Sequence, residues 1–258
     1  MASKDSTTKT IIVALVLCVV CSIIVSTAAV MLRPAQKANK KADIKVNILK
    51  AAGMYEAGQN IDEEFKRIEP RLVDLSTGKF SSDLDVASYD QLKAAKNPSL
   101  SSPIPAEDDI ASLSRREQYA KVYLVKDEQG ALEKIVLPIR GYGLWSTLKG
   151  FVALEADLNT IVGLGYYDHK ETPGLGGEVD NPSWKSLWSG KKVYGDDGDV
   201  VISVIKGQVN ETTPGADHKV DGLSGATLTS NGVDYMLKYW LGDSGYAPFL
   251  DNLEKGEA

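Results

Sequence analysis

The sequence predicts an α+β domain, built on a mainly antiparallel sheet with flanking helices and preceded by one N-terminal transmembrane helix. Three observations lead to this expectation. Residues 11–32 form an uncharged apolar stretch, the middle of the chain holds pairs of strand-like segments joined by short turns, and segments with helical periodicity lie before and after those pairs. Strand pairs of this kind, flanked by helices, are typical of α+β folds.

The apolar stretch is long enough to cross a membrane. Residues 10–32 contain no charge, and residues 11–32 are rich in Val, Ile, Leu and Ala. A helix rises 1.5 Å per residue, so roughly 20 apolar residues span the hydrocarbon core of a bilayer. Signal peptides have shorter apolar cores, of about 7–15 residues. We therefore interpret residues 11–32 as an uncleaved anchor, residues 1–10 as a short N-terminal tail and residues 33–258 as a soluble domain.

The two cysteines, Cys18 and Cys21, both lie inside the apolar stretch. Their C-x-x-C spacing can indicate a metal or redox site. Cysteine is also a small apolar residue that packs well in helices, and two thiols lack the four ligands of a structural metal site. Packing is the favoured interpretation. The soluble domain contains no cysteine, so we expect no disulfide, no cysteine-bound cluster and no metal site there.

The charge balance argues against nucleic acid as a partner. The chain has a net charge of −6, and residues 33–258 contain 27 Lys and Arg against 34 Asp and Glu. An acidic domain lacks the basic field that neutralises phosphates. With two histidines in the chain, zinc sites, Cys–His nucleophiles and Ser–His–Asp triads have little support, and no G-x-x-x-x-G-K-[ST] phosphate loop occurs.

A mostly helical lead-in is expected over residues 33–70. The segment Lys41–Gly53 has apolar residues at helical spacing, and Asn60–Arg67 is expected to form a second short helix. The apolar positions of the first helix are Ile44, Ile48, Leu49 and Ala52. Pro70 is expected to interrupt the chain before a short strand over Leu72–Leu75.

The rest of the domain divides into strands and one long helix. Residues 94–108 contain three prolines and are expected to form a loop. Two hairpins and one further strand follow. The expected strands cover residues 119–125, 132–139, 150–156, 160–167 and 199–205. Residues 233–241 are expected to be helical, because their apolar residues recur on one helical face.

The most distinctive segment, Asp221–Ser230, places small and hydroxyl residues directly before this helix. One interpretation is an ordinary N-cap, in which Thr227, Thr229 or Ser230 accepts the first helical N–H bonds. The other is an anion site, because free N–H groups and the positive end of a helix attract a phosphate. The residues alone leave both interpretations open.

Within this segment, the string Asp221–Thr227 (DGLSGAT) resembles the flavinylation motif of bacterial FMN-binding domains. In those families a flavin transferase takes FMN from FAD and links it to a threonine by a phosphoester. The resemblance implies that FMN is held covalently on Thr227, with Thr229 as the nearby alternative. Ser224, Gly225 and Ala226 would complete the phosphate end of the site.

Two further motifs narrow the resemblance. His169–Gly177 (HKETPGLGG) and Gly143–Ser146 (GLWS), together with the anchor, resemble the C subunits of sodium-translocating NADH:quinone reductases over nearly the whole chain. The G subunits of Rnf ferredoxin–NAD complexes share the flavinylation motif and the first part of HKETPGLGG. The long Pro34–Arg71 segment and Gly143–Gly150 favour the reductase.

This resemblance implies an electron-transfer subunit of a bacterial inner-membrane redox complex with six subunits in total. Its partners would be the other subunits, the flavin transferase and the membrane. The Rnf-type G subunit remains an alternative. A different class of alternative is a non-catalytic, membrane-anchored flavin-binding sensor or assembly domain. No catalytic side chain is expected on this chain.

The flavin ring needs an apolar wall and a few backbone donors. Trp145 is a candidate for the wall, although a core tryptophan explains it equally well. The turn formed by Glu171, Thr172, Gly174, Leu175 and Gly176 is a candidate for ring contact, because its glycines allow close backbone approach; the alternative is a plain tight turn. The ribityl chain separates ring from phosphate, so Ser224–Thr227 is expected to hold only the phosphate end.

Two arguments predict opposite orientations of the chain in the membrane. Two lysines precede the anchor and five basic residues follow it within residues 33–45. A positive-inside count would keep residues 33–258 in the cytoplasm. The resemblance implies a cytoplasmic N-terminus, a single pass and a periplasmic domain. Long domains translocate largely regardless of nearby charge, so we expect the orientation that the resemblance implies.

Overall fold

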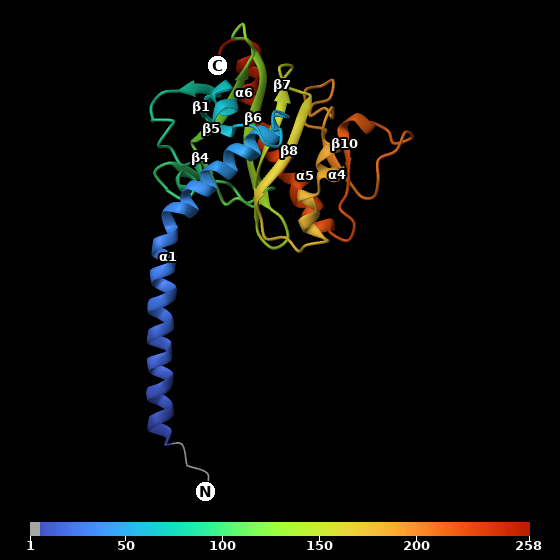
Figure 1. Cartoon of the computed structure of the whole chain (residues 1–258). Helices are drawn as coiled ribbons and strands as arrows, with labels where there is room; N and C mark the ends of the chain where they lie inside the picture. The colour runs from blue at the N-terminus through green and yellow to red at the C-terminus, as the bar shows by residue number, and fades with distance from the viewer. Residues whose placement is uncertain (1–5) are drawn as a thin grey trace. The chain divides into compact units, whose positions relative to one another are not determined.

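A computed structural model describes residues 6–258 and divides the chain into two compact units (Figure 1). The first ends at Ile44 and the second is Lys45–Ala258. Helix α1 (Thr7–Ala51) continues through Pro34 and is the one helix of the described residues long and apolar enough to cross a membrane. Its side chains are exposed as far as Asp43, including both cysteines, as expected of a helix that meets lipid.

The second unit is organised around a six-stranded sheet in the order β2-β1-β5-β6-β7-β8. Every neighbouring pair is antiparallel, which confirms the predicted fold class. The expected hairpins are β5 with β6 and β7 with β8. The strands are β1 (Ile68–Asp74), β2 (Lys79–Ser81), β5 (Tyr119–Lys126), β6 (Leu132–Tyr142), β7 (Thr147–Glu155) and β8 (Ile161–Asp168).

Pro70 lies inside β1, so the expectation that it interrupts the chain was wrong. β1 pairs with β5 from Ile68 to Asp74, but its pairing with β2 covers only Leu72–Asp74. The part of β1 that carries Pro70 therefore has one neighbouring strand. A proline is tolerated there because its missing N–H can face the unpaired side.

The remaining elements are short, apart from α5. Residues 94–108 are not entirely a loop, because β3 (Ser101–Pro103) pairs with β4 (Arg115–Glu117) and the Arg115 guanidinium donates to both the hydroxyl and the carbonyl of Ser101. The expected strand at 199–205 shortens to β9 (Ser203–Ile205), which pairs in parallel with β10 (Lys219–Asp221). The helices are α2 (Ile61–Glu64), η1 (Phe65–Arg67), α3 (Gln91–Ala94), η2 (Gly176–Asp180), α4 (Pro182–Ser186), η3 (Ala216–His218), α5 (Thr227–Leu241) and α6 (Ala247–Glu254).

Helix α5 packs against β6 on one face of the sheet and forms the centre of the main core. The apolar face predicted for this helix is confirmed, since Val233, Met236, Leu237 and Trp240 are all fully buried. Trp240 Nε1 also donates to the carbonyl oxygen of Arg140 at 2.7 Å, which ties the helix to β6. Burial of each large side chain is worth roughly 1.5–3 kcal/mol, so this contact fixes α5 firmly on the sheet.

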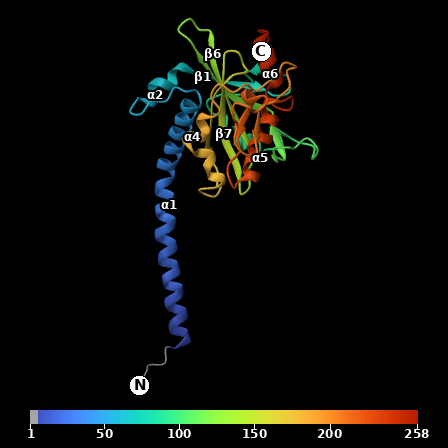
Figure 2. The ribbon, with the colours of Figure 1, turned by 90° about the vertical axis from the view of Figure 1, so that its right-hand side faces the viewer.

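The opposite face of the sheet is covered by the last turns of α1 and by the α2–η1 segment. Ile48 and Leu49 are fully buried, and a Cβ at Gly163 of β8 would lie 2.7 Å from the Ala51 carbonyl oxygen. Figure 2 shows α2 and α5 on opposite sides of the sheet. The sheet is therefore covered on both faces, and α5 is held so that its N-terminus lies at one end of the strands.

A buried ion pair between Arg140 of β6 and Glu117 of β4 links the main sheet to the segment that carries β4. The Arg140 guanidinium donates to one carboxylate oxygen of Glu117, and Gln91 Nε2 donates to the other at 2.6 Å. The Arg140 guanidinium also lies over the Trp240 ring, 5.6 Å from its centroid. Because Glu117 is fully buried, this anion depends on its partners for compensation.

Candidate functional site

Three segments that are distant in sequence meet at the N-terminus of α5. They are the loop after β6 (residues 143–146), the turn after β8 (residues 169–177) and the first turn of α5. Their contact point is the carboxylate of Glu171, whose residue is 5% exposed. Its Oε2 accepts a 2.7 Å hydrogen bond from the Thr229 hydroxyl, and its Oε1 faces the loop after β6.

Three consecutive backbone N–H groups of that loop donate to the Glu171 carboxylate. The distances to Oε1 are 3.2 Å from Leu144, 3.0 Å from Trp145 and 3.3 Å from Ser146. The Leu144 N–H also lies 3.3 Å from Oε2. Three converging N–H groups make a concave anion site, and here a side chain of the same chain occupies it.

The turn after β8 has its own internal bonding. The Lys170 N–H donates to Ser146 Oγ at 2.7 Å, and the Glu171 N–H donates to His169 Nδ1 at 3.2 Å. His169 Nε2 then donates to Asp180 Oδ2 at 2.7 Å. His169 therefore has a structural role, because both of its ring nitrogens bond within this part of the chain. The Thr172 carbonyl closes the turn by accepting from the N–H groups of Leu175 and Gly177.

Glycines let these segments approach one another closely. A Cβ at Gly143 would lie 2.7 Å from Glu171 Oε1, and a Cβ at Gly176 would lie 2.5 Å from Thr229 Oγ1 and 2.7 Å from Glu171 Oε2. Real Cβ atoms do not come so near to other heavy atoms. The backbone approach that Gly176 permits is thus directed at the Glu171–Thr229 pair.

Helix α5 begins at Thr227, and the structure contradicts the N-cap interpretation of this segment. The residue at the cap position is Ala226, which has no side-chain oxygen and makes no capping bond. The Thr229 hydroxyl donates to Glu171 instead, and Ser230 Oγ accepts from the Leu223 N–H at 2.9 Å. The first N–H groups of the helix have no acceptor within the helix itself. The anion-site interpretation of the sequence consequently fits this helix end better.

The two candidate threonines differ sharply in accessibility. Thr227 is exposed, as are Ser224 and Gly225, three and two residues before it, whereas Thr229 is 0% exposed. Gly225 has a φ of +70°, and a Cβ there would lie 3.0 Å from a terminal methyl of Leu175. The turn after β8 therefore contacts the segment that carries Thr227.

Large apolar side chains are exposed on these same three segments. Trp145 is 64% exposed, whereas Trp184, Trp188 and Trp240 are 7% exposed or less. Trp145 is therefore not a core tryptophan. The other exposed apolar side chains of the segments are Leu144, Leu175 and Leu228. Exposed apolar side chains gathered at one place indicate a surface that another group covers.

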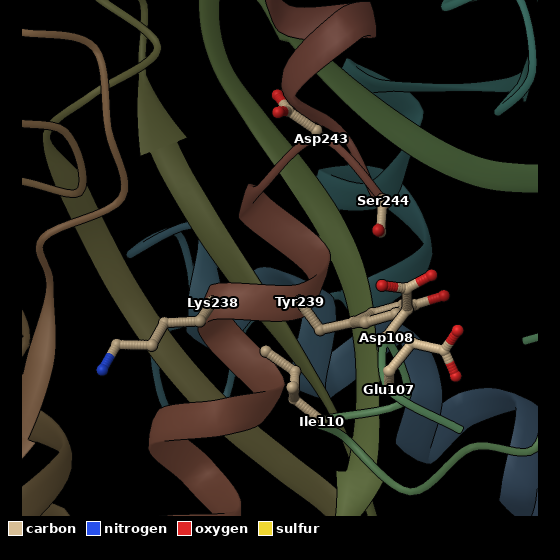
Figure 3. Close-up of a pocket in the computed structure, with 7 residues that line it drawn as sticks. All are labelled: Glu107, Asp108, Ile110, Lys238, Tyr239, Asp243 and Ser244. Carbon is tan, nitrogen blue, oxygen red and sulfur yellow. The ribbon is translucent and has the colours of Figure 1, made fainter. Parts of the chain in front are cut away.

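Two clefts lie elsewhere in the second unit. One is lined by Glu107, Asp108, Ile110, Lys238, Tyr239, Asp243 and Ser244, and Figure 3 shows Lys238 pointing away from the carboxylates of Glu107 and Asp108. Its amino group instead pairs with Asp234 at 2.7 Å. The other cleft is lined by residues of 76–118. Within residues 6–258, no group of three or more His, Cys, Asp or Glu side chains is placed to hold a metal ion.

Comparison with known proteins shows the class first. The FMN-binding domain family matches residues 143–242, a range that begins at the loop after β6 and ends just after α5. All three segments described above lie within it. The fold and this match define an FMN-binding domain that follows a single long apolar helix.

Full-length relatives then show the particular family. The chain is 54% identical to the C subunit of the Na(+)-translocating NADH-quinone reductase of Pseudomonas aeruginosa, over 100% of both chains, and 50% identical to that of Vibrio vulnificus, over 99% of both. The crystal structure of NqrC from Shewanella oneidensis superposes with a TM-score of 0.78 at 39% identity, covering 84% of this chain and 99% of that one. The chain belongs to the family of C subunits of the Na(+)-translocating NADH-quinone reductase.

Proposed function

We propose that the chain carries FMN joined to Thr227 by a phosphoester and relays electrons within the sodium-translocating complex. The observation that carries this proposal is the contrast between the two threonines. The Thr227 hydroxyl is exposed at the first position of α5, while the Thr229 hydroxyl is buried and donates to Glu171. A flavin transferase acting on the folded domain can reach Thr227 and cannot reach Thr229.

The residues present fit both ends of FMN. At the phosphate end, the N–H groups of the first turn of α5 and the positive end of its dipole favour an anion beside Thr227. Ser224, Gly225 and Ala226 precede it, and the left-handed backbone at Gly225 turns the chain into the helix. At the ring end, the exposed side chains of Trp145 and Leu175 offer an apolar wall, with the Glu171–Gly176 turn beside it.

The attachment step that this proposal requires is a phosphoryl transfer. The Thr227 oxygen attacks the FMN phosphorus of FAD, which is supplied with the flavin transferase. The bond between that phosphorus and the oxygen of the AMP half breaks as the new phosphoester forms. AMP leaves with the electron pair, and the threonine proton is released. Thr227 needs only an accessible oxygen and a nearby field that favours the phosphate.

The open surface at Trp145 supports the relay role. When bound, FMN supplies one-electron and two-electron chemistry that protein side chains do not. Neutral N–H groups close to the ring would stabilise added electron density, and the apolar wall would limit access of water. Because the Trp145 surface is open, redox partners in the other subunits can approach it. Oxidation of NADH and sodium passage are assigned to those subunits.

The orientation and domain division form part of the same proposal. We place the N-terminus in the cytoplasm, the anchor at residues 11–32 and residues 33–258 in the periplasm, in a complex of six subunits. The apolar helix and the relatives support a single-pass anchored subunit. If the chain were instead a stand-alone sensor or assembly domain, it would purify without five further subunits.

Denaturing gel electrophoresis with in-gel flavin fluorescence tests the attachment site. We expect the full-length wild-type band to fluoresce and the Thr227→Ala band to be dark. Thr229→Val, which keeps the shape of the side chain and removes its hydroxyl, serves as the matched control and is expected to stay bright. A bright Thr227→Ala band would refute the assignment. A bright Thr227→Ala band together with a dark Thr229→Val band would move the attachment site to Thr229.

A further inference from the structure

We infer that Glu171 is a positioning residue. It holds the loop after β6, which carries Trp145, against the first turn of α5 without touching the flavin ring itself. Its carboxylate joins the segment that offers the apolar wall to the helix that begins at Thr227. The functional part of this inference rests on the proposed function. The structural part stands on the bonds of Glu171 alone.

The bonding capacity of the carboxylate is fully used. An ionised carboxylate offers about four lone-pair positions. Glu171 receives the N–H groups of residues 144–146 and the hydroxyl of Thr229, and the Leu144 N–H is shared between both oxygens. No acceptor position is left for a ligand. This refines the expectation from the sequence, in which Glu171 itself was a candidate for ring contact.

The environment gives the carboxylate no alternative partners. Glu171 is 5% exposed, and the groups that donate to it are all neutral N–H and O–H groups. A buried anion without a cation depends on such bonds, so their loss would leave it uncompensated. Gly143 and Gly176 lie where any side chain would displace it. The carboxylate of Glu171 is therefore held in one position, and it joins the loop after β6 to the first turn of α5.

Both of the joined segments matter for a bound flavin. The Trp145 N–H makes the shortest of the three amide bonds, at 3.0 Å, so the loop is fastened at the residue that offers the wall. On the other side, Thr229 lies two residues after Thr227 in the same turn of α5. Release of Glu171 would let the wall move relative to the attachment point, which changes ring contacts while leaving the Thr227 hydroxyl accessible.

Glutamine at this position separates geometry from charge. The carbonyl oxygen of Glu171→Gln can accept the three loop N–H groups, and its NH₂ group can donate to Thr229 Oγ1. Glu171→Ala makes none of these bonds. Glu178→Ala is the matched control, because Glu178 directly follows the same turn and its side chain bonds only to Asn181 among the contacts observed.

The experiment uses the full-length flavin-loaded protein in detergent, with two readouts. Hydrogen exchange at the amides of residues 144–146 should accelerate at least about tenfold in Glu171→Ala, because all three N–H groups lose the acceptor that Glu171 provides. It should stay within about threefold of wild type in Glu171→Gln and Glu178→Ala. The flavin absorption spectrum and midpoint potential should shift in Glu171→Ala with covalent flavin retained, and return to wild type in Glu171→Gln.

Each result bears on a separate part of the inference. Unchanged exchange in Glu171→Ala would overturn the bonds themselves. Accelerated exchange with an unmoved spectrum and potential would overturn the positioning role, as would a Glu171→Gln protein as impaired as Glu171→Ala. If Glu171→Ala does not fold, Glu171→Asp provides the same test, with smaller shifts in the same directions expected. Wild-type protein without covalent flavin would refute the proposed function and leave the exchange test intact.

Discussion

Gly176→Ala is the substitution that most directly strains the contact between the turn after β8 and α5. The added Cβ would lie 2.5 Å from Thr229 Oγ1 and 2.7 Å from Glu171 Oε2. Neither atom can move freely, because Thr229 is fully buried in α5 and the Glu171 carboxylate is held by three N–H groups. Overpacking of a closed site costs about 1–3 kcal/mol, and loss of the charge-assisted Thr229–Glu171 bond costs about 1.5–3 kcal/mol.

The two costs overlap, because relief of the clash breaks the bond, so we expect a loss of about 3 kcal/mol in the free energy of unfolding. For a domain of this size, 1 kcal/mol corresponds to roughly 2–4 °C, so Tm should fall by about 6–12 °C. Thermal denaturation of the full-length protein in detergent, followed by tryptophan fluorescence, measures it.

Gly165→Ala is the control for adding a methyl group to a glycine. It lies in β8, where a Cβ would meet no heavy atom within 4 Å, and its backbone is not left-handed. Its Tm should stay within about 2 °C of wild type or rise slightly, because alanine reduces the entropy of the unfolded chain. If the Tm of the Gly176→Ala protein equals that of the Gly165→Ala protein, the tight contact between the turn and α5 is refuted.

Three further predictions concern the ring surface, the orientation and the core. Trp145→Ala and Leu175→Ala should each retain covalent FMN but change its absorption spectrum and midpoint potential, because each removes part of the proposed apolar wall. An alkaline phosphatase fusion after Ala258 should be active, as a periplasmic domain requires. Glu117→Ala should lower the free energy of unfolding by about 3–5 kcal/mol in denaturant titrations, because it leaves the Arg140 charge buried without its partner.

Each of these predictions has a clear contrary result. Wild-type spectra and potentials in both ring-surface variants would place the ring elsewhere. An inactive phosphatase fusion, together with an active cytoplasmic reporter at the same position, would reverse the orientation. For the core, a Glu117→Ala protein as stable as wild type would show that Arg140 finds another compensation. The double variant Glu117→Leu with Arg140→Met is expected to recover much of the loss, since it removes both charges.

The sheet was predictable because its strands obey local rules. Alternating and continuous apolar runs with turn residues between them marked β5 to β8, and the apolar face of α5 followed from its spacing. Pro70 misled the prediction of β1. The sequence does not show that β2 is short and pairs only with the part of β1 after Pro70. The strand β3 was not expected because its support comes from Arg115, a side chain distant in sequence.

The candidate site was predictable in its members and not in its connections. The motifs indicated the loop with Trp145, the turn with Glu171 and the segment before Thr227, and the structure brings all three together. The role of Thr229 could not be read from the sequence, where it was a candidate helix cap and a second candidate for attachment. Its bond to Glu171 links residues 58 positions apart, and no local pattern encodes such a contact. The exposure of Trp145 likewise depends on tertiary packing.

Mass spectrometry of a single tryptic peptide tests the central claim most directly. Cleavage after Lys219 and Lys238 releases residues 220–238, which contain Ser224, Thr227, Thr229 and Ser230. We predict that this peptide from the native protein is heavier by one FMN less one water, and that fragmentation places the added mass on Thr227. An unmodified peptide, or an added mass placed on Thr229 or either serine, would contradict the account.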